Sequence, residues 1–312
     1  MLFDFNCNEY KYREQFDEFP QIENHDFRFT TCTCGETNSY VVSTVSRHRN
    51  FLPIVACANC GTLRANPYFT QETAAYYYGN IYGKVKRSGR SPEQLFNEQK
   101  ERSLAPFLAD FSEACSSVLD FGGGAGGRTA EMISPERSVS LHEVESEYSQ
   151  YAYSQGILPY DAAKKYDLVV VSHVIEHMID PVSQMADVIR DCCADGGLLM
   201  VATPIIDRQR ARQWLQHFHI AHKYYFTHDA LIGLMAGLGC TLLKHNNNDA
   251  YLFRVGAEID PQFVADSYAR GARRTMELIE AELRPSVKGW LRSLKFWRPQ
   301  PHSQKDPSGK SI

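Results

Sequence analysis

The sequence predicts an α/β protein in which a domain built on a parallel sheet follows a small cysteine-rich module. Two observations predict the sheet. Residues 118–121 form a short apolar segment that leads into five glycines among six residues, the pattern of a buried strand ending in a turn with exposed backbone. Residues 166–172 are rich in β-branched side chains without polar alternation, as expected for a central parallel strand buried on both faces. Two cysteine pairs between residues 32 and 60 predict the module.

Length and composition exclude several classes of protein. A chain of 312 residues is long enough for about two domains. With 43% hydrophobic and 22% charged residues it is not disordered throughout. Its net charge of −4 disfavours binding nucleic acid by broad phosphate neutralisation. No stretch approaches 18 consecutive apolar residues and the first residues lack a signal-peptide pattern. We therefore expect a cytoplasmic protein.

Nine cysteines in such a compartment are expected to be thiols or metal ligands. A C-x-C-G segment and a C-x-x-C-G segment contain Cys32, Cys34, Cys57 and Cys60. Four thiolates can hold a structural Zn²⁺ tetrahedrally, with no position left open for substrate. The first pair is one residue shorter than the common knuckle, so His25 or His48 is an alternative ligand. The other interpretation is a set of shielded thiols in a small β-rich module, with strands at 40–45 and 52–56.

Three tyrosines that follow the second cysteine pair are candidate substrate contacts: Tyr76, Tyr78 and Tyr82. Aromatic rings stack on the apolar faces of pyranoses, and phenol hydroxyls anchor them. Alternatively, these tyrosines pack the module against the next domain. Residues 84–91 then form a polar, basic linker or lid. Ser91 and Pro92 predict the start of a helix that continues with an apolar face to Phe111.

The glycine-rich turn is the centre of the predicted site. Without a Cβ, Gly122, Gly124 and Gly126 can take positive φ and bring the backbone close to a ligand, while residues 129–133 begin a helix whose free N–H groups point the same way. The spacing is G-x-G-x-G and not the G-x-G-x-x-G of dinucleotide sites. Asp120 precedes the first glycine by two residues.

A second strand, residues 138–142, ends at Glu143. A carboxylate at this strand tip can accept hydrogen bonds from both hydroxyls of a ribose. Glu145 is the alternative if the strand runs two residues longer.

Asp120 and the glycines form a D-x-G-x-G-x-G pattern, and from about residue 30 to 255 the chain resembles class I S-adenosylmethionine-dependent methyltransferases. The C-x-x-C-G pair, the Asn66-Pro67 dipeptide and the tyrosines resemble the N-terminal part of a bacterial subgroup found with surface-polysaccharide and small-sugar biosynthesis. The resemblance implies that the glycines accommodate the methionine part of S-adenosylmethionine, that Asp120 supports the turn and the amino group, and that Glu143 holds the ribose.

The resemblance also implies the division of the chain. The expected parts are an N-terminal extension at 1–25, a zinc-ribbon-like cysteine-rich module at 26–90, a Rossmann-like seven-stranded methyltransferase domain at 91–258, and a C-terminal helical and basic extension with a disordered tail at 259–312.

The candidate catalytic residues follow the strand at 166–172. The segment from His173 to His177 reads His-Val-Ile-Glu-His and resembles the family's His-Val-Leu-Glu-His. Methyl transfer needs no metal, but a hydroxyl acceptor must lose its proton, and histidine can act as the base near neutral pH. His173 is best placed, followed by His177 and His222. Alternatively, His173 only hydrogen-bonds the cofactor or the loop. The spacing also resembles an inverted zinc-protease motif, but its place at a strand end beside a proline disfavours that interpretation.

The remaining elements complete the expected domain. Asp180 caps a helix that carries Met185 and Cys193 on one face and stops at Gly196-Gly197. A strand at 198–204 follows, and then a helical stretch at 208–216. Residues 222–227 resemble an active-site loop of the family, which implies that His222 and Tyr224 contact substrate. The last parts, listed by range, are a helix at 229–239, antiparallel strands at 240–243 and 250–255, and a helix at 263–283.

The expected reaction is methylation of a hydroxyl of a sugar or polysaccharide intermediate. The related sugar C-methyltransferases carry a further C-terminal domain, so the length of this chain favours O- or N-methylation. Methylation of RNA or protein, and a catalytically inactive binding scaffold, are the alternatives. Residues 287–298 combine two tryptophans with basic side chains and are expected either to lie at a membrane surface, to dock on a partner, or to cover their own domain.

Overall fold

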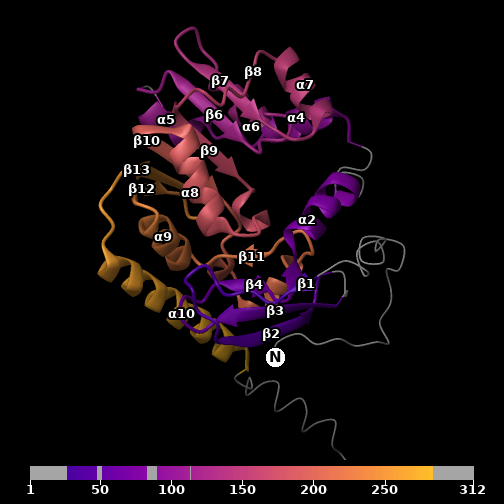
Figure 1. Ribbon diagram of the computed structural model, residues 1–312, viewed down its shortest axis with the longest axis vertical. Helices are drawn as coiled ribbons and strands as arrows, with labels where there is room; N and C mark the ends of the chain where they lie inside the picture. The colour runs from indigo at the N-terminus through magenta and orange to yellow at the C-terminus, as the bar shows by residue number, and fades with distance from the viewer. Residues whose placement is uncertain (1–26, 48–50, 83–89, 113, 284–312) are drawn as a thin grey trace, which may run out of the picture.

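A seven-stranded sheet forms the larger part of the protein in the computed structural model, which describes residues 27–47, 51–82, 90–112 and 114–283 (Figure 1). Its strand order is β12-β13-β10-β9-β6-β7-β8. Strands β10, β9, β6, β7 and β8 run parallel, β13 is antiparallel to β10, and β12 is antiparallel to β13. The strands are β6 (Ser117–Phe121), β7 (Ser138–His142), β8 (Leu158–Pro159), β9 (Tyr166–Ser172), β10 (Cys193–Ala202), β12 (Cys240–His245) and β13 (Ala250–Val255). The predicted α/β fold with a Rossmann-like seven-stranded sheet is confirmed.

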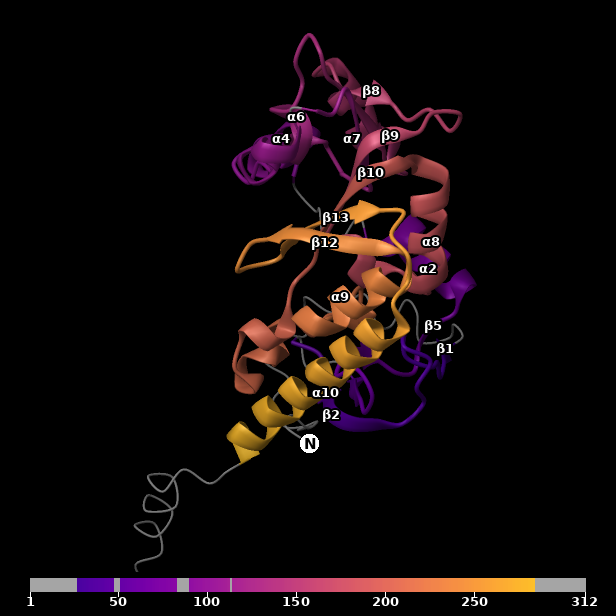
Figure 2. The same cartoon turned by 90° about the vertical axis from the view of Figure 1, so that its left-hand side faces the viewer.

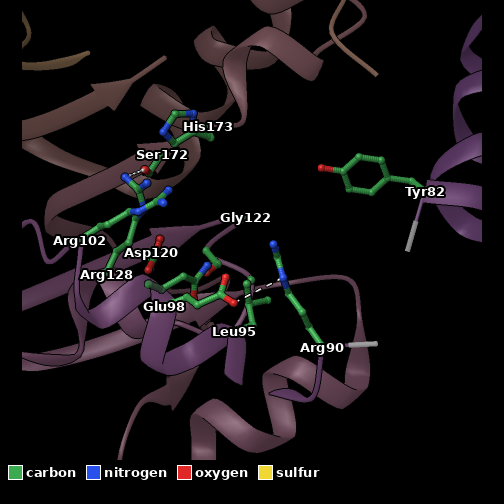
Figure 3. A pocket seen from close by; sticks show the side chains of 13 residues that line it. Tyr82, Arg90, Leu95, Glu98, Arg102, Asp120, Gly122, Arg128, Ser172 and His173 are labelled. Carbon is green, nitrogen blue, oxygen red and sulfur yellow. Dashed lines mark hydrogen bonds and ion pairs between the residues drawn. The ribbon is translucent and has the colours of Figure 1, made fainter. Parts of the chain in front are cut away.

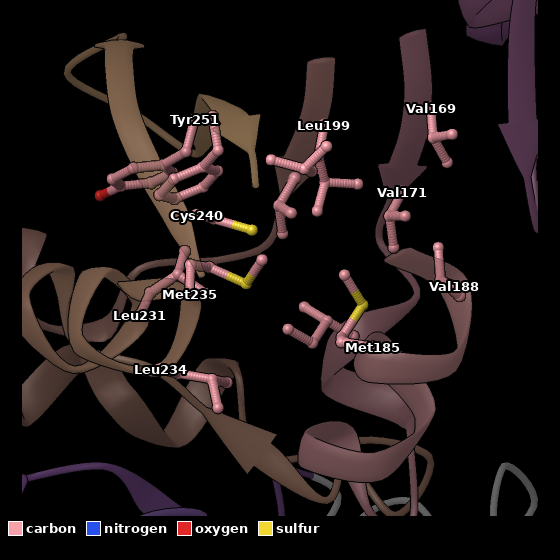
Figure 4. Packing of buried hydrophobic residues seen from close by; sticks show 14 of the residues in the cluster. Val169, Val171, Met185, Val188, Leu199, Leu231, Leu234, Met235, Cys240 and Tyr251 are labelled. Atoms are coloured by element: carbon pink, nitrogen blue, oxygen red, sulfur yellow. The ribbon is translucent and has the colours of Figure 1, made fainter. Parts of the chain in front are cut away.

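Helices cover both faces of this sheet. They are α4 (Pro92–Lys100), α5 (Ala105–Ser112), α6 (Gly127–Ala130), α7 (Ser146–Ser154), α8 (Pro181–Cys192) and α9 (His228–Gly237). The central strand β9 sends Val169 and Val171 into the core beneath α8 and α9 (Figure 4) and Leu168 and Val170 into the core on the opposite face. The run of β-branched residues is therefore buried on both sides, as predicted.

Four helix predictions differ from the structure. The helix capped by Asp180 stops at Cys192, because Cys193 already pairs with Tyr166 as the first residue of β10. The single helix predicted after Ser91 is two helices, α4 and α5. The helix after the glycines is the four-residue α6, and the stretch predicted at 208–216 consists of two short 3₁₀ segments, η4 (Ile206–Arg208) and η5 (Ala211–Gln216).

A second sheet, in the order β11-β4-β3-β2, lies below the first in Figure 1. It contains β2 (Ser39–Val45), β3 (Phe51–Cys57), β4 (Leu63–Ala65) and β11 (Tyr224–Tyr225). A two-stranded pair, β1 (Phe27–Arg28) with β5 (Tyr68–Phe69), precedes α2 (Gln71–Tyr77) and the π-helical turn η2 (Tyr78–Tyr82). Strand β11 comes from far along the chain, and the core of this sheet includes Trp214, Phe218 and Tyr225. The N-terminal segment alone therefore does not complete the small sheet.

The long helix α10 (Pro261–Leu283) packs against α9 (Figure 2). It also contacts the turn that holds the second cysteine pair. A Cβ on Gly271 would lie 2.5 Å from the carbonyl oxygen of Cys60. One turn later, the Thr275 hydroxyl donates a hydrogen bond of 2.8 Å to the carbonyl of Gly61. This contact joins the cysteine-containing turn to the C-terminal helix.

Within the described residues, no helix is both long and apolar enough to cross a membrane. The basic, tryptophan-containing segment at 287–298 lies outside the described residues.

Candidate functional site

The glycine-rich turn between β6 and α6 adopts the backbone conformation that its sequence predicts. Gly122, Gly124 and Gly126 have φ angles of +71°, +61° and +79°, a region that favours glycine. Position 123 requires a residue without a Cβ for another reason. Any Cβ there would lie 2.2–2.4 Å from the carboxyl atoms of Asp120. The turn therefore wraps closely around the Asp120 carboxylate, which fixes where backbone groups face a ligand.

Asp120 is buried beneath this turn, with 1% of its surface exposed. Its Oδ2 accepts a hydrogen bond of 2.8 Å from the Thr129 hydroxyl, whereas Oδ1 has no partner within the part of the chain that the structure describes. Burial raises the pKa of Asp120 to about 6, although the Thr129 hydrogen bond and the nearby Arg128 oppose the shift. A buried acceptor without a donor is suited to the amino group of a ligand.

A cleft of about 290 Å³ lies at the glycine-rich turn, and Asp120 is among the residues that line it (Figure 3). Elements distant in sequence line it: η2, α4, the end of β6 with its turn, α6 and the end of β9. The lining residues are Tyr82, Arg90, Leu95, Glu98, Gln99, Arg102, Asp120, Gly122, Gly123, Gly124, Arg128, Ser172 and His173. Asp120, Gly122, Gly124, His173 and Tyr82, all candidates from the sequence, therefore meet around one cleft. Its position at the carboxyl ends of parallel strands is where open α/β sheets bind ligands.

Sequence reasoning missed several lining residues, among them Gln99 and Arg128. The Gln99 side chain, on α4, donates to the carbonyl of Gly123 at 3.0 Å and accepts from the N–H of Gly127 at 3.1 Å, and so holds both sides of the turn. Arg128, directly after the glycines, donates to the Ser172 hydroxyl at 3.1 Å. Burial lowers the pKa of Arg128, while Asp249 and Asp120 act in the opposite direction. A guanidinium at this place can pair with an anionic group of a ligand.

Glu143 contacts the glycine-rich turn from the tip of β7. Its Oε2 accepts a hydrogen bond of 2.8 Å from the N–H of Gly124, and its Oε1 accepts one of 3.0 Å from the N–H of Glu145. Each carboxylate oxygen has a second acceptor position. Of the two candidate ribose ligands, Glu143 is thus the one whose carboxylate touches the turn.

His173 has a φ of +57°, the only positive value among the non-glycine residues that the structure describes. Such backbone strain is concentrated at functional sites. Its Nδ1 lies 3.2 Å from Oε1 of Glu176, and its Nε2 lies 3.7 Å from Oδ2 of Asp249. Burial raises the pKa of Glu176, but the hydrogen bond to His173 and the neighbouring histidines outweigh burial and lower it to about 2. The ring, 36% exposed, is therefore flanked by two carboxylates at the edge of the cleft.

An aromatic group surrounds His177, which follows His173 by four residues. The rings of His177 and His222 are 4.6 Å apart and perpendicular, and the rings of Tyr78 and Tyr82 lie 5.9 and 5.8 Å from His177. Burial raises the pKa of Tyr78 well above its usual value. Four of the candidate catalytic and substrate residues thus come together from three separate segments.

The other two candidate substrate residues do not join this group. Tyr224 is 3% exposed and belongs to the hydrophobic core, 5.8 Å from Phe226 ring to ring. The sequence prediction for Tyr224 missed the alternation of β11, in which Tyr224 packs into one core and Tyr225 into the other. Tyr76 is 38% exposed on α2 and does not line the cleft.

The four cysteines of the two predicted knuckles lie together at a second site. Sγ of Cys32 is 3.5 Å from Sγ of Cys60, and Sγ of Cys34 is 3.5 Å from Sγ of Cys57. All four sulfurs lie within 4.8 Å of one another. A tetrahedral Zn²⁺ with Zn–S bonds near 2.3 Å holds its sulfurs about 3.8 Å apart, so the cluster fits that ion. The alternative ligands His25 and His48 lie outside the described residues.

Comparison with known families identifies the domain that holds the cleft. Residues 96–245 match the family model described as a methyltransferase domain. This part of the chain is a methyltransferase domain. The match spans the glycine-rich turn, Glu143 and the three candidate catalytic histidines.

The chain has no match among curated proteins. Among solved structures it is similar to human N-acetylserotonin methyltransferase, at 18% identity over 59% of this chain and 62% of that chain, with a TM-score of 0.45. It is also similar to the 1,6-didemethyltoxoflavin-N1-methyltransferase of Burkholderia thailandensis, at 14% identity over 66% and 96% of the chains, with a TM-score of 0.48. An O-methyltransferase from neocarzinostatin biosynthesis matches at 15% identity over 60% and 64%, with a TM-score of 0.43. This chain thus spans less than two thirds of the human enzyme's chain.

Proposed function

We propose that this methyltransferase transfers a methyl group from S-adenosylmethionine to a hydroxyl of a sugar or of a surface-polysaccharide intermediate. The observation that carries the proposal is the place of His173, at the edge of the cleft and between two carboxylates. A hydroxyl acceptor has to lose a proton as it is methylated, and a histidine near the reacting atoms can accept that proton.

In the proposed cofactor site, the residues of the turn bind and orient S-adenosylmethionine, which supplies the activated methyl group. Gly122, Gly124 and Gly126 accommodate its methionine part by close backbone approach. Asp120 accepts a hydrogen bond from its amino group, which would satisfy the unpaired Oδ1. Glu143 holds the ribose hydroxyls beside the N–H of Gly124.

In the proposed transfer, the acceptor hydroxyl would give its proton to Nε2 of His173 while its oxygen bonds to the methyl carbon. The bond from that carbon to the sulfonium sulfur would break in the same step, which releases S-adenosylhomocysteine. Glu176 orients the ring through Nδ1. The imidazolium formed in this step would be stabilised by Glu176 on one side and Asp249 on the other. His173 thus acts as base, and Glu176 is a positioning residue.

The class of acceptor is supported by the aromatic group. Tyr82 lines the cleft, and Tyr78 lies edge to face with both Tyr82 and His177. Aromatic rings with adjacent polar atoms are typical of sites that bind the apolar faces and hydroxyls of sugars. Methylation of a sugar oxygen is the reaction that uses these features together with the base.

The proposal includes a structural zinc ion on Cys32, Cys34, Cys57 and Cys60. Such an ion would join the turn that precedes β2 to the end of β3 and would contribute directly to folding. It also includes a cytoplasmic location, because none of the eight cysteines in the described residues is in a disulfide.

The test is methylation of a panel of nucleotide sugars and glycans by the purified protein, with S-adenosylhomocysteine and a methylated product measured together by mass spectrometry. His173→Ala should lower the turnover rate by about 10²–10⁴-fold and leave S-adenosylhomocysteine affinity unchanged, whereas the exposed-residue control His245→Ala should behave as wild type. Methylation of RNA or protein with no sugar accepted would overturn the proposed acceptor class, and full activity of His173→Ala would overturn the assignment of the base.

A further inference from the structure

A group of three side chains beside the cleft has the composition of a metal site. One carboxylate oxygen of Glu176, one ring nitrogen of His177 and one ring nitrogen of His222 lie within 4.8 Å of one another. Glu176 and His177 belong to the 3₁₀ turn η3 (Ile175–His177) after β9, and His222 precedes β11. The N–H of Lys223 donates to the carbonyl of Glu176 at 2.8 Å, which ties the two segments together. The three side chains are therefore held close together by this backbone hydrogen bond and by the adjacency of Glu176 and His177.

Glu176 is buried and only half satisfied. It is 1% exposed. Its Oε1 faces Nδ1 of His173 at 3.2 Å, but its Oε2 has no hydrogen-bond partner anywhere in the described ranges. A buried carboxylate oxygen without a donor costs free energy unless a proton donor or a cation supplies the missing interaction. A bound cation would remove this penalty.

The hydrogen bonds of His177 indicate which of its ring nitrogens carries the proton. Nδ1 lies 3.0 Å from the carbonyl oxygen of Ala221 and 3.1 Å from the Tyr78 hydroxyl. The Tyr78 hydroxyl donates its own proton to the same carbonyl, at 2.7 Å. Because a carbonyl only accepts, Nδ1 carries the imidazole proton and Nε2 carries the lone pair. Histidines that bind metals are usually oriented in this way, with the other ring N–H given to a backbone carbonyl.

We propose that Glu176, His177 and His222 bind a divalent transition-metal ion at a site separate from the four cysteines. Two imidazoles and one carboxylate are a ligand set used for Zn²⁺ and for Fe²⁺, and three protein ligands leave positions open for water or substrate. This differs from the cysteine cluster, whose four thiolates complete a tetrahedron.

The ion would lie where an acceptor binds. Glu176 contacts His173, which lines the cleft, and the Tyr82 ring, also on the cleft, is 5.8 Å from that of His177. On the proposed function, a sugar hydroxyl that binds the ion would have its pKa lowered, so that its proton would pass more readily to His173. Its oxygen would then bond to the methyl carbon as the methyl–sulfur bond breaks and S-adenosylhomocysteine leaves. No electron is exchanged with the ion. It acts on the acceptor only.

Cobalt binding to the full chain tests the site without any requirement for a substrate. The metal-free protein, kept reduced, is titrated with Co²⁺ and followed by absorption. Binding at the cysteines gives intense thiolate-to-cobalt charge transfer in the near ultraviolet. Binding at Glu176, His177 and His222 gives only weak visible bands. We expect a second equivalent of Co²⁺ that adds visible bands without further thiolate charge transfer.

Variants locate that second equivalent. In Glu176→Gln and in His222→Ala the affinity for the second equivalent of Co²⁺ should fall by about 100-fold or more. Loss of a direct metal ligand should cost more than the roughly 10–100-fold that follows loss of a residue hydrogen-bonded to a ligand. The cysteine signal should persist in both, and thermal unfolding followed by circular dichroism should show that the variants are folded. His245→Ala is the matched control and should keep both equivalents. If His222→Ala fails to fold, His222→Gln, closer in size, replaces it.

Two results would overturn the proposal: a wild-type protein that shows no binding outside the cysteines, or a second equivalent that survives in folded Glu176→Gln and His222→Ala. Either would leave His177 and His222 as hydrogen-bonding or basic groups without a metal. S-adenosylhomocysteine binding, measured on the same samples, separates this failure from failure of the proposed function, since the cofactor residues lie outside the three ligands.

Discussion

Glu143 and Gly124 are joined by a hydrogen bond of 2.8 Å from the N–H of the glycine to Oε2 of the glutamate. The bond connects the tip of β7 to the centre of the glycine-rich turn, although the two residues are 19 positions apart in sequence. It places the carboxylate where it can hold the turn and a ribose together.

Glu143→Ala is therefore expected to weaken S-adenosylhomocysteine binding by about 1.5–3 kcal/mol, the value of hydrogen bonds to a charged group. Isothermal titration calorimetry measures the change. Glu147→Ala, an exposed glutamate in the first turn of α7, is the control and should bind as wild type. Unchanged affinity of Glu143→Ala would move the ribose role to Glu145.

Gly123→Ala should disturb the turn, because the added Cβ would lie 2.2–2.4 Å from the Asp120 carboxyl atoms. Overpacking of this kind costs about 1–3 kcal/mol, and we expect lower thermal stability with loss of S-adenosylhomocysteine binding. Gly79→Ala is a matched control, since nothing lies within 4 Å of a Cβ at Gly79. A Gly123→Ala protein with wild-type stability and affinity would contradict the close wrapping of Asp120.

Asp120 should make stability depend on pH. Its folded pKa of about 6 lies above the usual 3.8, so the folded state holds the proton more tightly than the unfolded state. Its contribution is fully present below pH 4 and is lost as the pH rises to about 6, an effect of about 3 kcal/mol at most. Asp120→Asn should lack this loss. Denaturant unfolding from pH 4 to 7 measures the unfolding free energy of both proteins. If that free energy changed with pH in the same way in both, the raised pKa of Asp120 would be contradicted.

Cys57→Ser should release one equivalent of zinc and destabilise the small sheet, because a structural ion contributes its binding free energy to folding. Elemental analysis and circular dichroism of protein purified under reducing conditions measure the two effects. Cys240→Ala, a buried cysteine outside the cluster, should keep its zinc. A wild-type protein without metal would refute the zinc proposal.

Gly271→Ala should loosen α10, since the new Cβ would lie 2.5 Å from the carbonyl of Cys60 and 2.9 Å from the Thr227 hydroxyl. We expect the unfolding free energy to fall by about 1–3 kcal/mol and the melting temperature to fall with it. The exposed neighbour Arg273→Ala should have little effect. Equal melting temperatures for the two variants would show that the helix can shift at no cost.

Local patterns predicted the fold well where a single segment decided its own structure. Strand β9 could be found because its side chains are apolar on both faces, and the glycine-rich turn because its residues are consecutive. Asp180 caps α8 as predicted, accepting from the N–H groups of Val182 and Ser183. The end of α8 was misplaced because the pairing of Cys193 with Tyr166 depends on a strand 27 positions earlier.

The candidate site residues likewise differ in whether a local pattern marks them. Asp120, the glycines and His173 lie at strand ends that the sequence marks. Gln99 could not be found, because nothing near it in sequence indicates that its amide spans a turn 24–28 residues away. The grouping of Tyr78 with His177 and His222 depends on β11 completing the small sheet, a long-range pairing that no local pattern indicates.

Calorimetric titration of the folded protein with S-adenosylhomocysteine, the demethylated product of the cofactor, tests the central claim most directly. We predict binding in the micromolar range that is abolished in Gly124→Arg, whose side chain would enter the cleft past Gln99, and retained in Gly79→Arg. Absence of binding by the folded wild-type protein, or equal binding by Gly124→Arg, would contradict the assignment of the glycine-rich cleft as the cofactor site.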